Sequence, residues 1–404
     1  KQSRRTFIKS ITPSGRDVSR SDSVLVIVFL RGGADTLNMV IPFEDDEYYR
    51  ARPTIGLKTR SGGDNNTDLA VKINDFYAFH PRMVPLRDIF KDGRLSIIQA
   101  VGSDNLSGSH FEAQDQMEHG ECFNKSLEGG WLGRYLFYRT KENSSPLKAV
   151  SLGNRIPESL RGAPAACAIN SIEDVDLKVD RHYLNPSINA LSRLYGKSGD
   201  LLGKAGLDTL AALKKIEVVK AIHYRPTPGA NYGNDSFSKA MLEVARLIKA
   251  DIGLQVVCVD LDGWDTHFVQ GGASGLQANQ IDILTRGLTA FDLDIKAMRN
   301  RVTTLVMTEF GRRSYENSSL GTDHGRGFSM FCISEKIQGG KVFGKWPGIS
   351  GEGYDTILGP AGLSVEIDYR NVLYEIVRDI LNNCPPEKVF PDLNYQKINL
   401  VSVV

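Results

Sequence analysis

The chain has 404 residues, of which 41% are hydrophobic and 24% are charged, and its formal net charge is +1. This composition is ordinary for a globular protein, and the length suffices for a large hydrophobic core. Such a balanced charge excludes a strong long-range field for nucleic acid. No apolar run reaches the roughly 20 residues of a membrane-spanning helix. The five cysteines have no CxxC spacing, which argues against a thiolate zinc site.

The N-terminal residues 1–23 are polar and rich in Ser and Arg, which predicts a mobile arm. Within it, SRRTFIKS (3–10) has the form of a twin-arginine export signal. Such a signal continues into an apolar segment, whereas the next residues here are polar. Two interpretations remain open. A shortened signal predicts a periplasmic or exported protein, and an accidental arginine pair predicts a cytoplasmic one.

From residue 24 onward, short apolar runs alternate with segments of helical periodicity. This alternation predicts an α/β fold with a largely parallel sheet. We interpret 24–404 as a single domain, with insertions at about 155–235 that include a helical stretch at 201–221. The predicted strands are 24–30, 95–101, 149–153, 254–261, 302–308 and 328–334, and the other predicted helices are 238–252, 280–300 and 369–383.

Polar side chains follow four of these strands, at the edge where open α/β sheets bind ligands. We therefore expect them to converge into one site. They are Asp35 after the first strand, Ser107, Ser109 and His110 after the second, Asp265 and His267 after the fourth, and Glu309, Arg312, Asp323 and His324 after the fifth.

Each of these residues also has a purely structural interpretation. Asp35 could cap a helix at Thr36, and Ser109 could cap the next helix with Glu112 completing a capping box. His267 could be an ordinary loop histidine, Glu309 could pair with a nearby arginine, and the Asp-His pair at 323–324 could form a turn between glycines. All these coincidences would have to fall at one edge of the sheet, which favours a site.

The residue types define the chemistry. Imidazole and carboxylate ligands suit Zn²⁺, Mn²⁺ or Fe²⁺, and additional carboxylates admit Mg²⁺ or Ca²⁺. A hydroxyl beside such an ion is activated as a nucleophile, and the ion stabilises charge on a phosphoryl or sulfuryl oxygen. Arg31 and Arg312 could clamp an oxyanion.

Four motifs in this order closely resemble the bacterial family called domain of unknown function 1501, over about residues 24–384. They are VLVIVFLRGGADTLNMVIPFEDDEYYRARPTIGL, SHFEAQDQMEHG, GWDTH and EFGRRSYENSSLGTDHGRG. The family is grouped with the alkaline phosphatase and sulfatase superfamily. The resemblance therefore implies a three-layer α/β/α fold, a metal site at the strand ends and, in many members, a twin-arginine leader.

The resemblance also implies roles for single residues. Asp35 matches a bridging metal ligand, Ser109 (or Ser107) the nucleophile, and Asp265 with His267 the ligands of a first metal, with Asp262 in support. For a second metal, either Asp323 and His324 serve, or Glu309 and Phe310 occupy the places of an Asp-His pair and His324 is a distant third histidine. Relatives read DHGHG where this chain has Arg326. No histidine follows 324, so both roles cannot be filled.

We thus predict a metal-dependent hydrolase of small phosphate or sulfate esters. Its catalytic residues would be Ser109, His110 and Arg312, and its divalent cation (Zn, Mn, Mg or Ca) would bind Asp35, Asp265, His267, Glu309, Asp323 and His324. The alternative is a non-catalytic exported protein that binds an unknown protein partner and retains an incomplete metal site. Phe310 and Arg326, at ligand-like positions, favour that alternative.

Overall fold

The computed structural model describes residues 23–60, 66–121, 127–139, 145–349 and 362–401. The arginine pair at residues 4–5 and nearly all of the predicted arm lie outside these ranges. None of the helices in the described ranges is both long enough and apolar enough to cross a bilayer.

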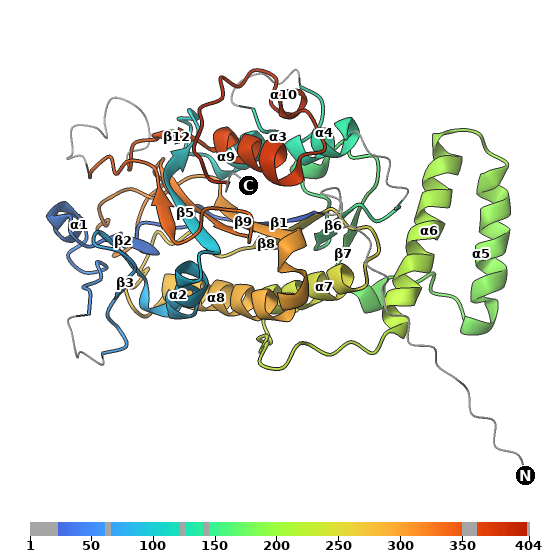
Figure 1. Ribbon diagram of the computed structural model, residues 1–404, viewed down its shortest axis with the longest axis horizontal. Helices are drawn as coiled ribbons and strands as arrows, with labels where there is room; N and C mark the ends of the chain where they lie inside the picture. The colour runs from blue at the N-terminus through green and yellow to red at the C-terminus, as the bar shows by residue number, and fades with distance from the viewer. Residues whose placement is uncertain (1–22, 61–65, 122–126, 140–144, 350–361, 402–404) are drawn as a thin grey trace, which may run out of the picture.

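Within the described residues, a nine-stranded sheet forms the centre of the protein (Figure 1). Its order is β11-β5-β10-β9-β1-β8-β6-β7, and β12 also pairs with β5. Only β10 runs antiparallel to its neighbours in this sheet, so the predicted largely parallel sheet is confirmed. The strands are β1 (Val24–Leu30), β5 (Leu95–Gly102), β6 (Ala149–Leu152), β7 (Ala166–Ile169), β8 (Val256–Leu261), β9 (Val302–Thr308), β10 (Phe328–Ile333), β11 (Lys341–Phe343) and β12 (Ile367–Asp368).

Strand β1 shows why helices cover both faces of the sheet. All of its residues are buried, and successive side chains belong alternately to two hydrophobic cores. Neighbouring side chains of a strand point to opposite faces, so a continuous apolar run needs cover on both sides. Figure 1 shows the resulting α/β/α layers, with α2, α7 and α8 on one face and α3, α4 and α9 on the other.

The α-helices are α1 (Asp46–Ala51), α2 (Val84–Lys91), α3 (His110–His119), α4 (Trp131–Tyr138), α5 (Arg181–Gly196), α6 (Leu201–Ala221), α7 (Ser236–Lys249), α8 (Leu276–Asp294), α9 (Tyr369–Glu375) and α10 (Pro386–Val389). The short helical turns are η2 (Pro81–Met83), η3 (Glu158–Leu160), η4 (Ile172–Asp174), η5 (Lys296–Arg301) and the π-helix η7 (Ile376–Leu381). A small second sheet joins β2 (Val40–Pro42), β4 (Tyr77–Phe79) and β3 (Val71–Lys72).

Several elements differ from the sequence-based expectation. The predicted helix 369–383 is α9 followed by a π-helical turn, and the predicted helix 280–300 ends at Asp294 before a 3-10 turn. Strand β7 and helix α5 lie in the 155–235 stretch interpreted as insertions, where the sequence predicts only the helix at 201–221. Pro186 inside α5 explains the latter difference, because proline is a strong signal against a helix interior. Helices α5 and α6 pack on each other beside the sheet (Figure 1).

The strand directions decide where polar loops can meet. Strands β1, β5, β8 and β9 point the same way, so their carboxyl ends share one edge of the sheet. Because β10 is antiparallel, it starts at that edge, and the segment 309–327 between β9 and β10 stays there as well. Loops that are far apart in the sequence therefore come together at this edge.

Candidate metal centre

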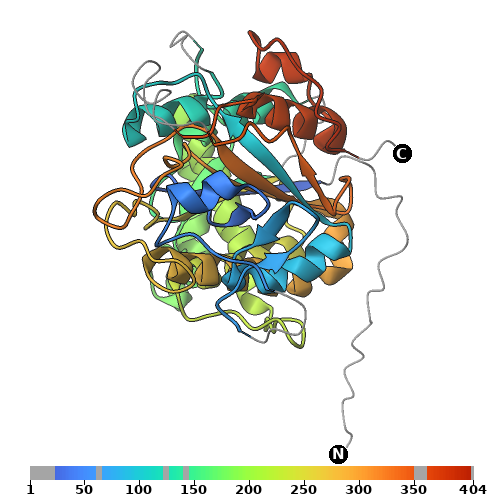
Figure 2. The same ribbon diagram turned by 90° about the vertical axis from the view of Figure 1, so that its left-hand side faces the viewer.

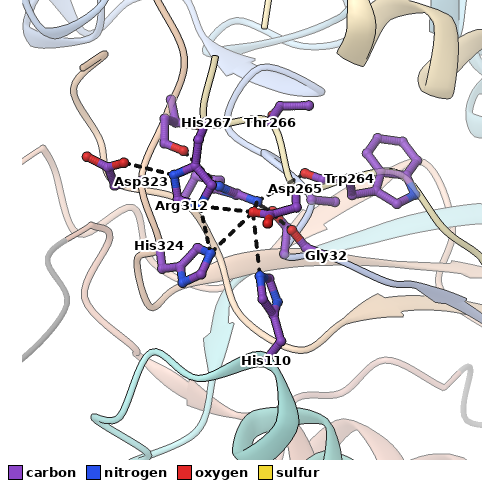
Figure 3. Close-up of polar contacts among 12 residues, drawn as sticks. Gly32, His110, Trp264, Asp265, Thr266, His267, Arg312, Asp323 and His324 are labelled. Carbon is purple, nitrogen blue, oxygen red and sulfur yellow. Dashed lines mark hydrogen bonds and ion pairs between the residues drawn. The ribbon is translucent and has the colours of Figure 1, made fainter. Parts of the chain in front are cut away.

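Three imidazoles and one carboxylate meet at this edge (Figure 3). His110 is the first residue of α3, Asp265 and His267 follow β8, and His324 precedes β10. The Nε2 atoms of His267, His324 and His110 lie 3.0, 3.2 and 3.5 Å from Asp265 Oδ1. The Nε2 atoms of His267 and His324 are 3.0 Å apart. We call these four residues the imidazole cluster.

The opposite nitrogen of each ring has a fixed acceptor. The Nδ1 atoms of His110, His267 and His324 lie 2.8, 2.9 and 2.8 Å from Glu309 Oε1, Asp323 Oδ1 and the carbonyl oxygen of Gly108. A carbonyl or carboxylate oxygen accepts, so Nδ1 carries the proton and Nε2 of the neutral ring presents a lone pair. Metal-binding histidines are commonly oriented in this way.

When the rings are neutral, the Nε2 atoms of His267 and His324 therefore face each other as two acceptors, 3.0 Å apart. Two such lone pairs repel unless a proton or a metal cation lies between them. His110 Nε2 is buried, and among the described residues it has no hydrogen-bond partner. A donor set of imidazole nitrogens and one carboxylate oxygen suits Zn²⁺ and related divalent ions. On these observations the residues present fit a bound cation.

Neighbouring groups and burial shift the pKa values of Asp265, His110 and His324. Burial by itself would raise the pKa of Asp265, but the hydrogen bond and charge of Arg312 outweigh it and lower that pKa to about 2. The hydrogen bond to Glu309 raises the pKa of His110, against the effect of burial. Burial, followed by the charge of Arg312, lowers the pKa of His324. Asp265 is thus an anion at neutral pH, as a ligand must be.

Arg312 corrects one prediction. Its side chain is fully buried, and its Nη2 donates to Asp265 Oδ1 at 2.6 Å. The other donations go to backbone carbonyls, from Nε to Gly33 at 2.6 Å, from Nη1 to Thr322 at 2.7 Å, and from Nη2 to Gly32 at 2.5 Å and to Trp264 at 3.1 Å. A guanidinium with these partners holds the loops together and orients Asp265. The sequence-based expectation that Arg312 clamps a substrate oxyanion does not fit this arrangement, because its donors already bond to protein oxygens.

The position of Asp35 also differs from the prediction that it is a metal ligand. It is buried and paired with Arg52, with Asp35 Oδ2 2.6 Å from Arg52 Nη1 and Asp35 Oδ1 3.0 Å from Arg52 Nη2. The predicted helix at Thr36 is a turn, so Asp35 is not a helix cap either. Gln270 Nε2 donates to Asp35 Oδ2 at 2.6 Å. The structure therefore places Asp35 in a buried ion pair outside the imidazole cluster.

Gln270 links the Asp35–Arg52 ion pair to the loop after β8 and to the segment before β10. Its Oε1 accepts from Thr266 Oγ1 at 3.0 Å and from Thr322 Oγ1 at 2.7 Å. Thr266 lies between two cluster residues, and Thr322 directly precedes Asp323. Neither Gln270 nor Arg52 was expected to have a role. No local motif marks them, because their partners are distant in the chain.

Glu309 and Asp323 contact the imidazole Nδ1 atoms and thus lie behind the ligand-like nitrogens. Glu309 is buried and also accepts from the Gly32 backbone N–H at 2.8 Å and from Gln114 Nε2 at 2.9 Å. Phe310 packs its ring 4.9 Å from that of His110 and 4.8 Å from that of His324. The aromatic side chain therefore lines the cluster and supplies no ligand.

Ser109 occupies the N-cap position of α3, but its side chain makes no capping hydrogen bond, so the capping box does not form. Its backbone N–H donates to Ser107 Oγ at 3.1 Å. Asp262 is exposed. Arg31, the other expected clamp, pairs with Glu118 at 2.5 Å and Asp260 at 3.0 Å. Ser109 directly precedes His110 of the cluster in the chain.

Comparison with solved structures finds similar folds at low identity. A structure titled Ps i-CgsB in complex with k-i-k-neocarrahexaose gives a TM-score of 0.37 at 9% identity, over 93% of this chain and 75% of that one. Alkaline phosphatase from the Antarctic bacterium TAB5 gives 0.29 at 9% identity, over 90% and 99%. The PH0037 protein from Pyrococcus horikoshii gives 0.29 at 10% identity, over 90% and 98%. TM-scores this low carry no information on function.

No curated protein matches the chain. The family described as Protein of unknown function (DUF1501) matches residues 22–373, which is most of the chain and includes every residue of the imidazole cluster. The chain belongs to this family.

Proposed function

We propose that this protein is a metal-dependent hydrolase of small phosphate or sulfate esters. The observation that carries the proposal is the convergence of three imidazole Nε2 atoms on one carboxylate oxygen. His110, Asp265, His267 and His324 would hold a single divalent cation. Glu309 and Asp323, predicted as ligands, would instead keep the imidazoles in the ligating tautomer and orientation.

A divalent cation at such a site supplies Lewis acidity toward an ester oxygen and lowers the pKa of a nearby hydroxyl. The chain's own groups would do the rest. Ser109 offers a partly exposed hydroxyl, one residue before a cluster imidazole, as the nucleophile. Arg312 keeps Asp265 ionised and in place. Phe310 presents an apolar wall, which strengthens the electrostatic interactions beside it.

Two observations favour the alternative of an exported binding protein with an incomplete site. Asp35 is tied to Arg52, and Phe310 stands where a second histidine would be needed. A two-metal centre would require both positions. The proposed hydrolase therefore works with one cation, and a protein without hydrolysis would keep that cation as a structural or binding element.

Metal content and ester hydrolysis test the proposal together. The purified protein should contain about one equivalent of a divalent metal by elemental analysis and should hydrolyse a chromogenic aryl phosphate or aryl sulfate. Asp265→Ala should lose both metal and activity, because a ligand is missing. Ser109→Ala should keep the metal and lose the activity.

Asp262→Ala is the matched control, since it removes an exposed carboxylate three residues from Asp265. It should keep both properties. Metal retention without hydrolysis of any ester would establish the binding-protein alternative. A wild type without metal after growth in metal-supplemented medium would overturn both.

The compartment is a further part of the proposal. The SRRTFIKS sequence and the family's common leader support export through the twin-arginine route. Fractionation of the native host should find the protein in the periplasm, and replacing both arginines by lysine should leave it in the cytoplasm. A cytoplasmic pool with the arginines intact would contradict export.

A further inference from the structure

Large exposed apolar side chains lie within a few residues of the cluster histidines in the chain. Phe111 follows His110 and is 88% exposed, while Phe268 and Val269 follow His267 and are 69% and 65% exposed. Leu320, in the loop that leads to Asp323, is 46% exposed. Single exposed apolar residues are ordinary, whereas a group of them around a polar site marks a binding surface. We call Phe111, Phe268, Val269 and Leu320 the apolar rim.

Backbone hydrogen bonds hold two parts of the rim together. The N–H of Val269 donates to the carbonyl of Ser319 at 2.9 Å, and the N–H of Gln270 donates to the carbonyl of Leu320 at 2.9 Å. Farther along the same pair of loops, Thr322 N–H donates to the Thr266 carbonyl at 3.2 Å. Three rim residues, Phe268, Val269 and Leu320, therefore belong to the same braced pair of loops as His267 and His324.

Asn317 extends this bracing to the cluster itself. Its side-chain Nδ2 donates to the carbonyl of His267 at 3.0 Å and to Asp323 Oδ1 at 3.1 Å. The ring of Phe268 lies 6.5 Å from the ring of His267. The ring of His110 packs edge-to-face against that of His324, with the ring centres 4.3 Å apart. This contact brings the start of α3, where Phe111 lies, to the same cluster.

Two of the rim residues have a strained backbone conformation. Val269 and Leu320 both have positive φ, 43° and 57°. This left-handed conformation is a rare state for a leucine and a genuine outlier for a β-branched valine. Strain of this kind persists where surrounding structure enforces it, and it is concentrated at ligand-binding sites. Here the two strained residues are the ones that the loop-to-loop hydrogen bonds pin.

We propose that the apolar rim is a subsite for the non-reacting part of the substrate, so that the natural substrate is an anionic ester of an aryl or long alkyl alcohol. This inference rests on the proposed function, which supplies the anion site. The acidic head would meet the imidazole cluster, and the apolar group would cover the rim. Burying that group removes apolar surface of both partners from water, which makes binding tighter.

Two phosphonates that resist hydrolysis test the subsite on the metal-loaded protein. Phenylphosphonate and methylphosphonate carry the same acidic head and differ in the apolar group. Calorimetry should show phenylphosphonate binding about tenfold more tightly, as expected from burial of part of a ring. Phe268→Ala should reduce this preference severalfold and leave methylphosphonate binding unchanged. Phe111→Ala provides a second, independent variant.

Phe137→Ala is the matched control, because Phe137 is 66% exposed in α4, which carries no residue of the cluster. It should leave the preference unchanged. If both phosphonates bind equally, the function stands and the subsite is overturned. If neither binds to metal-loaded protein, the proposed function itself fails and the subsite with it. Rim-dependent binding to anionic phospholipid vesicles without a phosphonate preference would overturn the subsite by assigning the rim to a membrane surface.

Discussion

Val269 is a residue held in a conformation that its own side chain disfavours. Such strain costs on the order of 1–3 kcal/mol, whereas the extra freedom of an unfolded glycine costs ~0.5–1 kcal/mol. Val269→Gly should therefore raise the free energy of unfolding by about 1 kcal/mol, measured by urea denaturation. Val269→Ala keeps a Cβ atom and should gain less than the glycine variant.

The same substitution should act in the opposite direction on binding. Val269→Gly removes part of the apolar rim, so the preference for phenylphosphonate should fall while stability rises. Such a trade between stability and function is expected where strain serves a site. A glycine variant that is less stable than wild type would contradict the strain interpretation of φ at this position.

At the scale of elements, His80 joins η2 to the loop after β8. Its Nδ1 accepts from the Arg82 backbone N–H at 3.0 Å, and its Nε2–H donates to the Gly272 carbonyl at 3.1 Å. Burial lowers the pKa of His80 to about 4, although the bond to Gly272 raises it. The ring is therefore neutral in the folded protein and protonates near its ordinary value of 6.5 in the unfolded chain.

This difference makes stability depend on pH. Between pH 6.5 and 4 the unfolded state binds more protons, so the contribution of His80 is present above pH 6.5 and is lost as pH falls through that window. Unfolding in urea at pH 7 and pH 5 should show a loss larger in wild type than in His80→Asn by ~2 kcal/mol. Asn keeps an acceptor for the Arg82 N–H. Equal losses in the two proteins would contradict a neutral, buried His80.

At the scale of the whole molecule, a bound cation would fasten together three distant parts of the chain. The cluster residues come from the start of α3, the loop after β8 and the segment before β10. A ligand that binds only the folded state at 100 times its Kd adds ~3 kcal/mol of stability. Removing metal with a chelator should therefore lower the melting temperature of the wild type by several degrees, about what this energy gives for a large domain.

The Asp265→Ala variant provides the comparison for this experiment. It should melt below the wild type, and chelator should not change its melting temperature. Asp262→Ala should behave like the wild type. A chelator effect of equal size in the Asp265→Ala protein would mean that the stabilising ion binds elsewhere. Among the described residues, the partly exposed group of Asp115, His119 and Glu158 is a candidate for that second place.

The amino-acid sequence by itself determined six strands of the central sheet, its largely parallel arrangement and the edge at which polar residues gather. The runs 24–30 and 302–308 agree residue for residue with β1 and β9. These features depend on local composition and periodicity, which a single sequence contains. The family could also be recognised from the sequence alone, because its motifs are continuous stretches of chain.

Only the tertiary structure decided the role of each site residue. Whether Asp35 meets a cation or Arg52, and whether Glu309 offers an oxygen to a metal or to an imidazole Nδ1, depends on contacts between segments tens to hundreds of residues apart. The direction of β10 likewise depends on its antiparallel pairing with β5 and β9. It keeps His324 at the edge where Asp265 lies. Such contacts follow from how the whole core packs, and no local pattern in the chain encodes them.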